Sequence, residues 1–158
     1  MVSNYGIVGE QAPEWYIKSW IDKDGNPTAV SLKDLRGRIV FVLCFQSWCP
    51  GCHSSGFPTL QKIQELFKDS NEVKLLAIQT VFESFESNTE DKVRKEQIKY
   101  NLQMPMGHDP GEDRSTIMRD YHTGGTPWII IIDKKGIVRY NDFHIDSSEA
   151  IEILRNLS

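Results

Sequence analysis

The sequence lacks the features that mark several large classes of protein. It holds only three cysteines among 158 residues, which excludes a small fold held together mainly by disulfides. Its formal net charge of −4 argues against nonspecific binding to nucleic acid or to an anionic membrane surface. Its longest apolar run, residues 39–45, is far shorter than the roughly 20 residues that a membrane-spanning helix needs. We therefore expect no nucleic-acid partner and no membrane insertion.

The N-terminal stretch also lacks the pattern of a secretion signal. No Lys or Arg precedes Lys18, and no long apolar run lies in this stretch. We therefore expect a cytoplasmic protein, with an exported protein whose leader has been removed as the alternative. The sequence contains no internal repeat, low-complexity tract or linker, and it is long enough to bury a core without disulfides. We expect residues 1–158 to form a single domain that is a monomer.

Hydrophobic patterns along the chain predict alternating strands and helices. Residues 39–45 are β-branched and aromatic without alternation, as in a strand buried on both faces. Residues 50–67 place apolar side chains three and four positions apart, as in an amphipathic helix. In the polar stretch 88–102, the mixed-sign run 92–96 is typical of an exposed helix face.

The other expected elements complete an α/β pattern with both parallel and antiparallel strand pairs. The expected strands are a hairpin at 15–21 and near Val30, a strand at 73–81, and a second hairpin at 128–132 and 137–140. The expected helices are one in 88–102 capped by Asn88 or Thr89, a short one at 114–121, and a closing one capped by Ser147 or Ser148.

A pair of cysteines directly follows the predicted central strand. Residues 48–52 read Trp-Cys-Pro-Gly-Cys. If a helix begins at Pro50, Cys49 lies at its N-terminus, where unpaired N–H groups and the helix dipole favour a thiolate. Cys52, one turn further along, is placed to attack a mixed disulfide formed on Cys49. The motif therefore predicts a nucleophilic and a resolving cysteine.

Segments along most of the chain carry a family resemblance. They are residues 9–15 (Gly-Glu-Gln-Ala-Pro-Glu-Trp), residues 31–38, the Cys49–Cys52 pair and residues 125–127 (Gly-Thr-Pro). In these segments the chain resembles the thioredoxin-fold thiol–disulfide oxidoreductases of the TlpA/ResA-like redoxin group, which is related to the AhpC/TSA superfamily. The resemblance implies a thioredoxin-like three-layer sandwich with a central mixed β-sheet flanked by helices. We expect the first hairpin to extend this fold at its N-terminus.

The resemblance also implies a function and a site. It implies that Cys49 and Cys52 form a redox-active disulfide that exchanges with protein thiols and disulfides through a mixed disulfide. Pro127 is expected in the cis form, in a loop whose backbone pairs with the partner as an added strand. The implied partner-binding residues are Trp48, Pro50, Gly51, Thr126 and Pro127. We expect no bound cofactor and no metal, because electrons pass to or from an upstream thiol reductant or oxidant.

The chain departs from the pattern of its relatives in three places. Leu43 and Ser55 stand where relatives carry an acid that relays a proton to the second cysteine. His53 is a candidate replacement, because an imidazole titrates near neutrality; the alternative is a solvated residue of the first helical turn. Pro58 lies six residues after Cys52 rather than five, so we expect the helix to break or loop out near Gly56.

Two other functional classes remain open. A thiol peroxidase of the peroxiredoxin type, an antioxidant enzyme, would need a Thr or Ser three residues before its reactive cysteine, where Gln46 precedes Cys49. A metal-binding thioredoxin-fold module would need more ligands; the sequence has no second Cys-x-x-Cys, and its four histidines show no ligand spacing. Cys44, inside the apolar strand, is expected to be an inert buried thiol.

Overall fold

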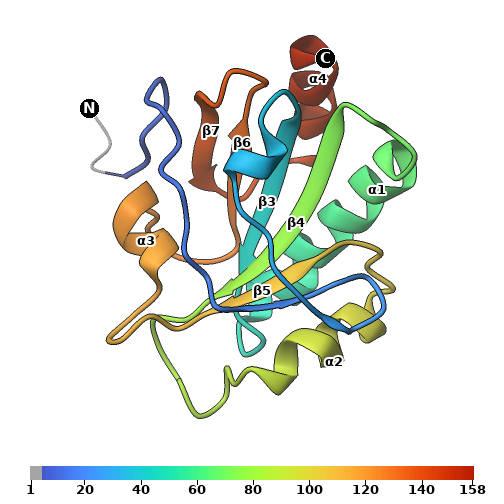
Figure 1. Ribbon diagram of the computed structural model, residues 1–158. Helices are drawn as coiled ribbons and strands as arrows, with labels where there is room; N and C mark the ends of the chain where they lie inside the picture. Colours follow the sequence, from blue (N-terminus) through green and yellow to red (C-terminus); the bar gives the residue numbers. More distant parts are fainter. Residues whose placement is uncertain (1–4) are drawn as a thin grey trace.

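The structure is a computed structural model that describes residues 5–158, in which the strands form one mixed sheet of seven (Figure 1). The order across the sheet is β2-β1-β5-β4-β3-β6-β7. The strands are β1 (Ser19–Ile21), β2 (Pro27–Thr28), β3 (Ile39–Phe45), β4 (Val73–Thr80), β5 (Met106–Asp109), β6 (Trp128–Ile132) and β7 (Val138–Phe143). The helical elements are the 3-10 turn η1 (Lys33–Leu35), the π-helical turn η2 (Cys52–Gly56), α1 (Phe57–Phe67), α2 (Asp91–Lys99), α3 (Thr116–Tyr121) and α4 (Ser147–Leu157).

Strand β3 lies inside the sheet, as its unbroken apolar sequence predicts. It pairs parallel with β4 and antiparallel with β6, and all of its residues are buried. Its alternate side chains enter two separate cores. Phe41 and Leu43 pack with α1, α2 and α4, whereas Val42 and Cys44 pack with α3 and the N-terminal segment on the opposite face. The helices therefore cover both faces of the sheet (Figure 1), which confirms the predicted three-layer α/β sandwich.

Strand β5 was not expected from the sequence. Its four residues, Met-Gly-His-Asp, include none of the β-branched or aromatic types that favour strands. Pairing in the fold determines it instead, because β5 lies between β4 and β1 and is parallel to the first and antiparallel to the second. The N-terminal hairpin of β1 and β2 is present but shorter than expected, and β5 joins it to the central sheet.

The expected helix caps were wrong at α2 and α4. Helix α2 begins at Asp91 with Glu90 at its N-cap, because the Asn88 side chain turns away and accepts a hydrogen bond from the N–H of Trp48. Helix α4 has Asp146 at its N-cap, and the Asp146 carboxylate accepts a hydrogen bond from the hydroxyl of Ser148. In both cases a neighbouring polar residue occupies the position that we assigned to Ser, Thr or Asn.

The helix after the cysteine pair does not break near Gly56. It runs from Pro50 to the end of α1, and the wide π-helical turn η2 accommodates the additional residue before Pro58. Pro58 then lies in the first turn of α1, where a missing N–H is tolerated. Within residues 5–158, we find no helix long and apolar enough to cross a membrane.

Candidate active site

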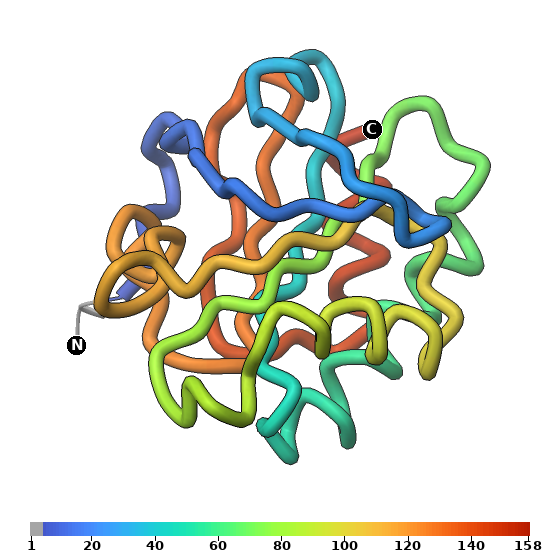
Figure 2. Tube along the Cα trace, turned by 60° about the horizontal axis from the view of Figure 1, so that its bottom comes forward, coloured from blue at the N-terminus to red at the C-terminus, as the bar shows by residue number. Residues whose placement is uncertain are grey.

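The cysteine pair lies at the carboxyl end of β3, where the chain turns into η2. Figure 2 shows this teal turn at the same end of the molecule as the yellow-green segment that leads into α2. Both cysteines are free thiols in this structure. Cys49 is buried with 7% of its surface exposed, and Cys52 is fully buried behind it. The N–H of Cys52 points at the Cys49 sulfur from 3.3 Å, so the start of the helix donates to the first thiol, as the motif predicts.

The surroundings shift the pKa values of the two thiols in opposite directions. Hydrogen bonding to the Cys52 side chain, to Thr126 and to the N–H groups of Cys52 and Gly51 lowers the pKa of Cys49 from 9.0 to about 6, against the opposing effect of burial. Burial, together with the hydrogen bond to Cys49, strongly raises the pKa of Cys52. At neutral pH the site therefore holds a thiolate at Cys49 and a protonated thiol at Cys52.

The loop at 125–127 packs directly against the cysteine pair. The peptide bond between Thr126 and Pro127 is cis, as expected. The carbonyl oxygen of Thr126 lies 3.5 Å from the Cys49 sulfur and accepts its hydrogen bond when the thiol is protonated. A Cβ atom on Gly51 would lie 3.3 Å from Pro127 Cδ, so glycine allows the start of the helix to approach the proline ring. Pro50 is exposed beside this contact.

Trp48 lies at the edge of the site, with 51% of its surface exposed. Its backbone N–H donates to Asn88 Oδ1 over 2.9 Å, which ties the cysteine turn to the loop at 82–88. The Trp48 side chain is therefore exposed beside Cys49, while the hydrogen bond to Asn88 holds its backbone in place. The structure thus gathers five sequence-predicted residues around Cys49 and Cys52. These are Trp48, Pro50, Gly51, Thr126 and Pro127.

Gln46 is a buried residue of the site, and its structural role was not predicted from the sequence. Its Oε1 accepts hydrogen bonds from the N–H groups of Phe82 and Glu83, and its Nε2 lies 3.4 Å from the Thr126 hydroxyl oxygen. This one amide thus joins the end of β3, the loop at 82–88 and the loop at 125–127. An amide directly after a fully apolar strand was the available signal, because a buried amide needs partners.

His53 is held firmly and is not the solvated residue of the alternative interpretation. Its Nε2 lies 2.6 Å from the carbonyl oxygen of Ser47, and its Nδ1 lies 2.5 Å from the Tyr100 hydroxyl oxygen. Glu96 Oε2 is 3.4 Å from His53 Nε2. The expectation that 92–96 is an exposed helix face was wrong at Val93 and Glu96, since both are buried.

Neither Leu43 nor Ser55, at the positions where relatives carry the proton-relaying acid, takes over its role. Leu43 lies in the core between β3 and α1. The hydroxyl of Ser55 donates to the carbonyl of Gly51 over 2.9 Å. Cys44 lies on the opposite face of the sheet from the cysteine pair, and burial strongly raises its pKa, so it remains a thiol as expected.

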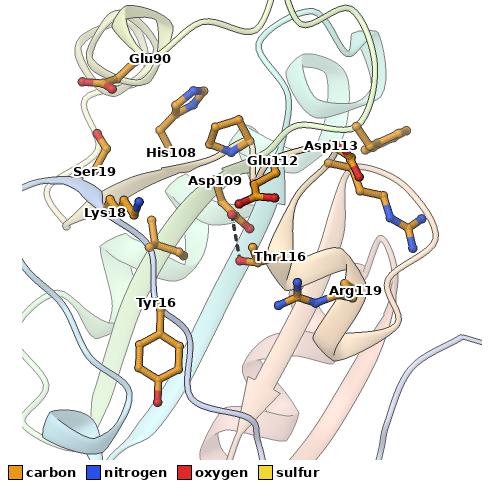
Figure 3. A pocket seen from close by; sticks show the side chains of 15 residues that line it. Tyr16, Lys18, Ser19, Glu90, His108, Asp109, Glu112, Asp113, Thr116 and Arg119 are labelled. Carbon is orange, nitrogen blue, oxygen red and sulfur yellow. Dashed lines mark hydrogen bonds between the residues drawn. The ribbon is translucent and has the colours of Figure 1, made fainter.

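A cavity of about 790 Å³ lies outside the cysteine site, and Figure 3 shows the side chains that line it. It opens between the N-terminal segment, the end of β5 and α3, and none of the described residues that line it is a cysteine. Its buried carboxylate, Asp109, accepts hydrogen bonds from the hydroxyls of Ser115 and Thr116 and from the N–H of Ile117. Asp109 therefore fixes the start of α3. Among residues 5–158 we find no group of three or more His, Cys, Asp or Glu side chains that could hold a metal ion.

Comparison with known proteins agrees with this geometry. The AhpC/TSA family model matches residues 8–141. The chain is 28% identical over 149 residues to the thioredoxin-like protein YneN of Bacillus subtilis, covering 94% of this chain and 78% of that protein. It is 28% identical over 131 residues to the thiol-disulfide oxidoreductase ResA of Bacillus cereus, covering 83% of this chain and 66% of ResA.

A solved structure shares the fold over nearly the whole chain. The crystal structure of a thioredoxin-like superfamily protein superposes with a TM-score of 0.84 and 32% identity, covering 93% of this chain and 95% of that one. The chain belongs to the AhpC/TSA family, and within it is a TlpA/ResA-like oxidoreductase with the thioredoxin fold.

Proposed function

We propose that this protein exchanges its Cys49–Cys52 dithiol with the disulfides of protein partners. The observation that carries the proposal is the opposite state of the two thiols: the pKa of Cys49 is lowered to about 6, while burial raises that of Cys52. A low-pKa thiolate beside a protonated, buried thiol suits attack on a disulfide followed by intramolecular release. The relative ResA is itself named a thiol-disulfide oxidoreductase.

The reaction is two successive displacements at sulfur. The Cys49 thiolate attacks one sulfur of the partner disulfide, and the other partner sulfur leaves as a thiolate. Cys52 then gives up its proton and attacks Cys49, which forms the Cys49–Cys52 disulfide and expels the second partner sulfur as a thiolate. The partner gains two electrons, and the Cys49–Cys52 pair loses two. The same steps in reverse oxidise a partner dithiol.

The partner contacts the rim around Cys49. In this proposal the backbone at Thr126 and Pro127 pairs with an extended partner segment, and Trp48 supplies apolar contact beside Pro50 and Gly51. No bound cofactor takes part, because an upstream thiol reductant or oxidant exchanges electrons with the same cysteine pair. We propose that the domain acts as a monomer. Gln46 stands three residues before Cys49, where a thiol peroxidase would need a Thr or Ser. Its amide is hydrogen-bonded to two loops, which favours disulfide exchange over peroxide reduction.

Trapping of the mixed disulfide tests the assignment of roles. Cys52→Ser should accumulate covalent adducts with protein disulfides, because Cys49 attacks and nothing resolves the product. Cys49→Ser, the matched control, should accumulate none, because Cys52 is fully buried. The measurement is nonreducing electrophoresis after incubation with a disulfide-containing protein. Equal trapping by both variants would overturn the assignment.

A further inference from the structure

Glu96 is a buried carboxylate without a full set of partners. It lies on α2 with 1% of its surface exposed, and among the described residues its Oε2 has no hydrogen-bond partner. Among the described residues, the basic side chain within ion-pair distance is that of His53, with Nε2 3.4 Å from Oε2. An incompletely paired carboxylate in the interior is unfavourable for folding, and such groups concentrate at functional sites. The place of Glu96 next to the cysteine helix therefore needs an explanation beyond packing.

The hydrogen bonds of His53 define where it can take up a proton. The carbonyl of Ser47 only accepts, so the nitrogen 2.6 Å from it, Nε2, carries a hydrogen. In the neutral ring, Nδ1 then has a free lone pair and accepts from the hydroxyl of Tyr100 at 2.5 Å. A proton added at Nδ1 creates an imidazolium, and Glu96 lies where it stabilises that charge. The three side chains can therefore store one proton.

This cluster combines the residue after the resolving cysteine with a side chain that packs against the same core. His53 directly follows Cys52, and Tyr100 stacks on Phe57 with ring centres 4.4 Å apart. Phe57 and Cys52 belong to the same core, against which Tyr100 packs. Burial raises the pKa of the Tyr100 phenol, with a smaller contribution from the charge of Glu96. Leu43 cannot take a proton from Cys52, and the hydroxyl of Ser55 is engaged with the backbone.

We propose that His53, joined to Tyr100 and held by Glu96, receives the proton that Cys52 loses when it attacks the mixed disulfide. The inference rests on the proposed exchange function. In the step, the Cys52 S–H bond breaks and its electron pair forms the bond to Cys49. The bond between Cys49 and the partner breaks, with its electron pair on the partner sulfur. The proton passes through the Tyr100 hydroxyl to His53 Nδ1. His53, with 27% of its side chain exposed, then returns it to solvent or to the partner thiolate.

Among the described residues, few other charged groups contact the cluster of His53, Tyr100 and Glu96. From α2, the Lys99 ammonium lies 5.3 Å from the centre of the Tyr100 ring. The cysteine segment contributes Cys49 and Cys52, whose hydrogen bond links them. Helix α1 contributes the uncharged side chains of Phe57, which stacks on Tyr100, and Gln61, which donates to the Tyr100 carbonyl. Glu96 is therefore the acid placed to hold a protonated His53.

The test separates the two chemical steps with one equivalent of an aromatic disulfide, 5,5′-dithiobis(2-nitrobenzoate). Attack by Cys49 releases the first coloured thiolate, and attack by Cys52 releases the second. In Tyr100→Phe and Glu96→Gln the second release should slow at least about tenfold at pH 7, with its pH profile shifted upward. The first release should keep its rate. Tyr100→Phe retains the stacked ring, and Glu96→Gln retains the side-chain volume.

The controls distinguish the possible failures. Glu86→Gln removes an exposed carboxylate from the loop at 82–88 and should leave both releases unchanged. His53→Gln should behave like the two relay variants. Glu96→Gln should melt at or above the wild-type temperature, because an amide replaces a poorly paired buried charge. Unchanged second release and pH profile in every variant would overturn the relay. Loss of the first release from wild-type protein would instead overturn the exchange function.

Discussion

At the scale of single residues, the pKa values of the two cysteines are shifted in opposite directions although the residues are only three positions apart. Cys49 faces the first N–H groups of the helix, which stabilise its thiolate. Cys52 lies one turn deeper among apolar side chains, where a charge is unfavourable. The sequence allowed this much to be predicted, because the motif and the strand before it determine both positions.

The pH dependence of Cys49 alkylation follows from its lowered pKa. Since only the thiolate reacts, the rate with iodoacetamide should rise with pH to half of its maximum near pH 6 and level off above it. The measurement is the alkylation rate of the reduced protein from pH 4 to 9, followed by mass spectrometry of the modified cysteine. Cys49→Ser should leave only slow alkylation, because Cys44 and Cys52 are buried. A wild-type rate that still rises steeply from pH 8 to 9 would contradict the assignment.

At the scale of elements, the π-helical turn η2 sets the distance between the cysteine helix and the cis-proline loop. Its last residue, Gly56, is buried where a Cβ atom would lie 3.0 Å from Pro127 Cβ and 3.5 Å from Leu43 Cδ1. The helix is therefore pressed against the loop along both Gly51 and Gly56. The departure in proline spacing was visible in the sequence. Its outcome, a wider turn and not a break, was decided by packing against Pro127.

Gly56→Ala should lower the free energy of unfolding by about 1–2 kcal/mol. The added methyl group meets the rigid ring of Pro127, and this overpacking outweighs the gain in helix propensity. Gly125→Ala is the matched control, because its Cβ atom meets nothing within 4 Å and it should change stability little. Urea unfolding of both variants measures the effect. A Gly56→Ala protein as stable as wild type would show that the two elements can separate without loss.

Elements and residues without a strong local pattern could not be predicted. Strand β5 forms because its neighbours pair with it, and its own residues have low strand propensity. Glu96 lies in a helix whose charges suggest an exposed face, yet the fold turns this position inward toward His53. The part played by Gln46 depends on two loops that are distant in sequence. These contacts are long-range, so the local spacing of residues carries little information about them.

At the scale of the whole molecule, the sheet brings four separate segments to one end. The cysteine turn at 46–53, the loop at 82–88, the end of α2 and the loop at 125–127 meet through the amide of Gln46 and the ring of His53. The family relationship and the thioredoxin fold agree with this arrangement. The cavity of about 790 Å³ does not include the cysteine pair, whereas Trp48 and Pro50 beside Cys49 are exposed, so a macromolecular partner can cover the site of the proposed reaction.

The most direct test is an equilibrium redox titration of the purified protein in glutathione and dithiothreitol buffers. Thiol counts and tryptophan fluorescence would be read together. The account predicts one reversible two-electron transition confined to Cys49 and Cys52, with Cys44 reduced throughout, and no transition in Cys49→Ser. Its midpoint would fall roughly within −270 to −120 mV, between the potentials of the reductant thioredoxin and the oxidant DsbA. The absence of a reversible transition, or one that survives Cys49→Ser, would contradict thiol–disulfide exchange as the function of this site.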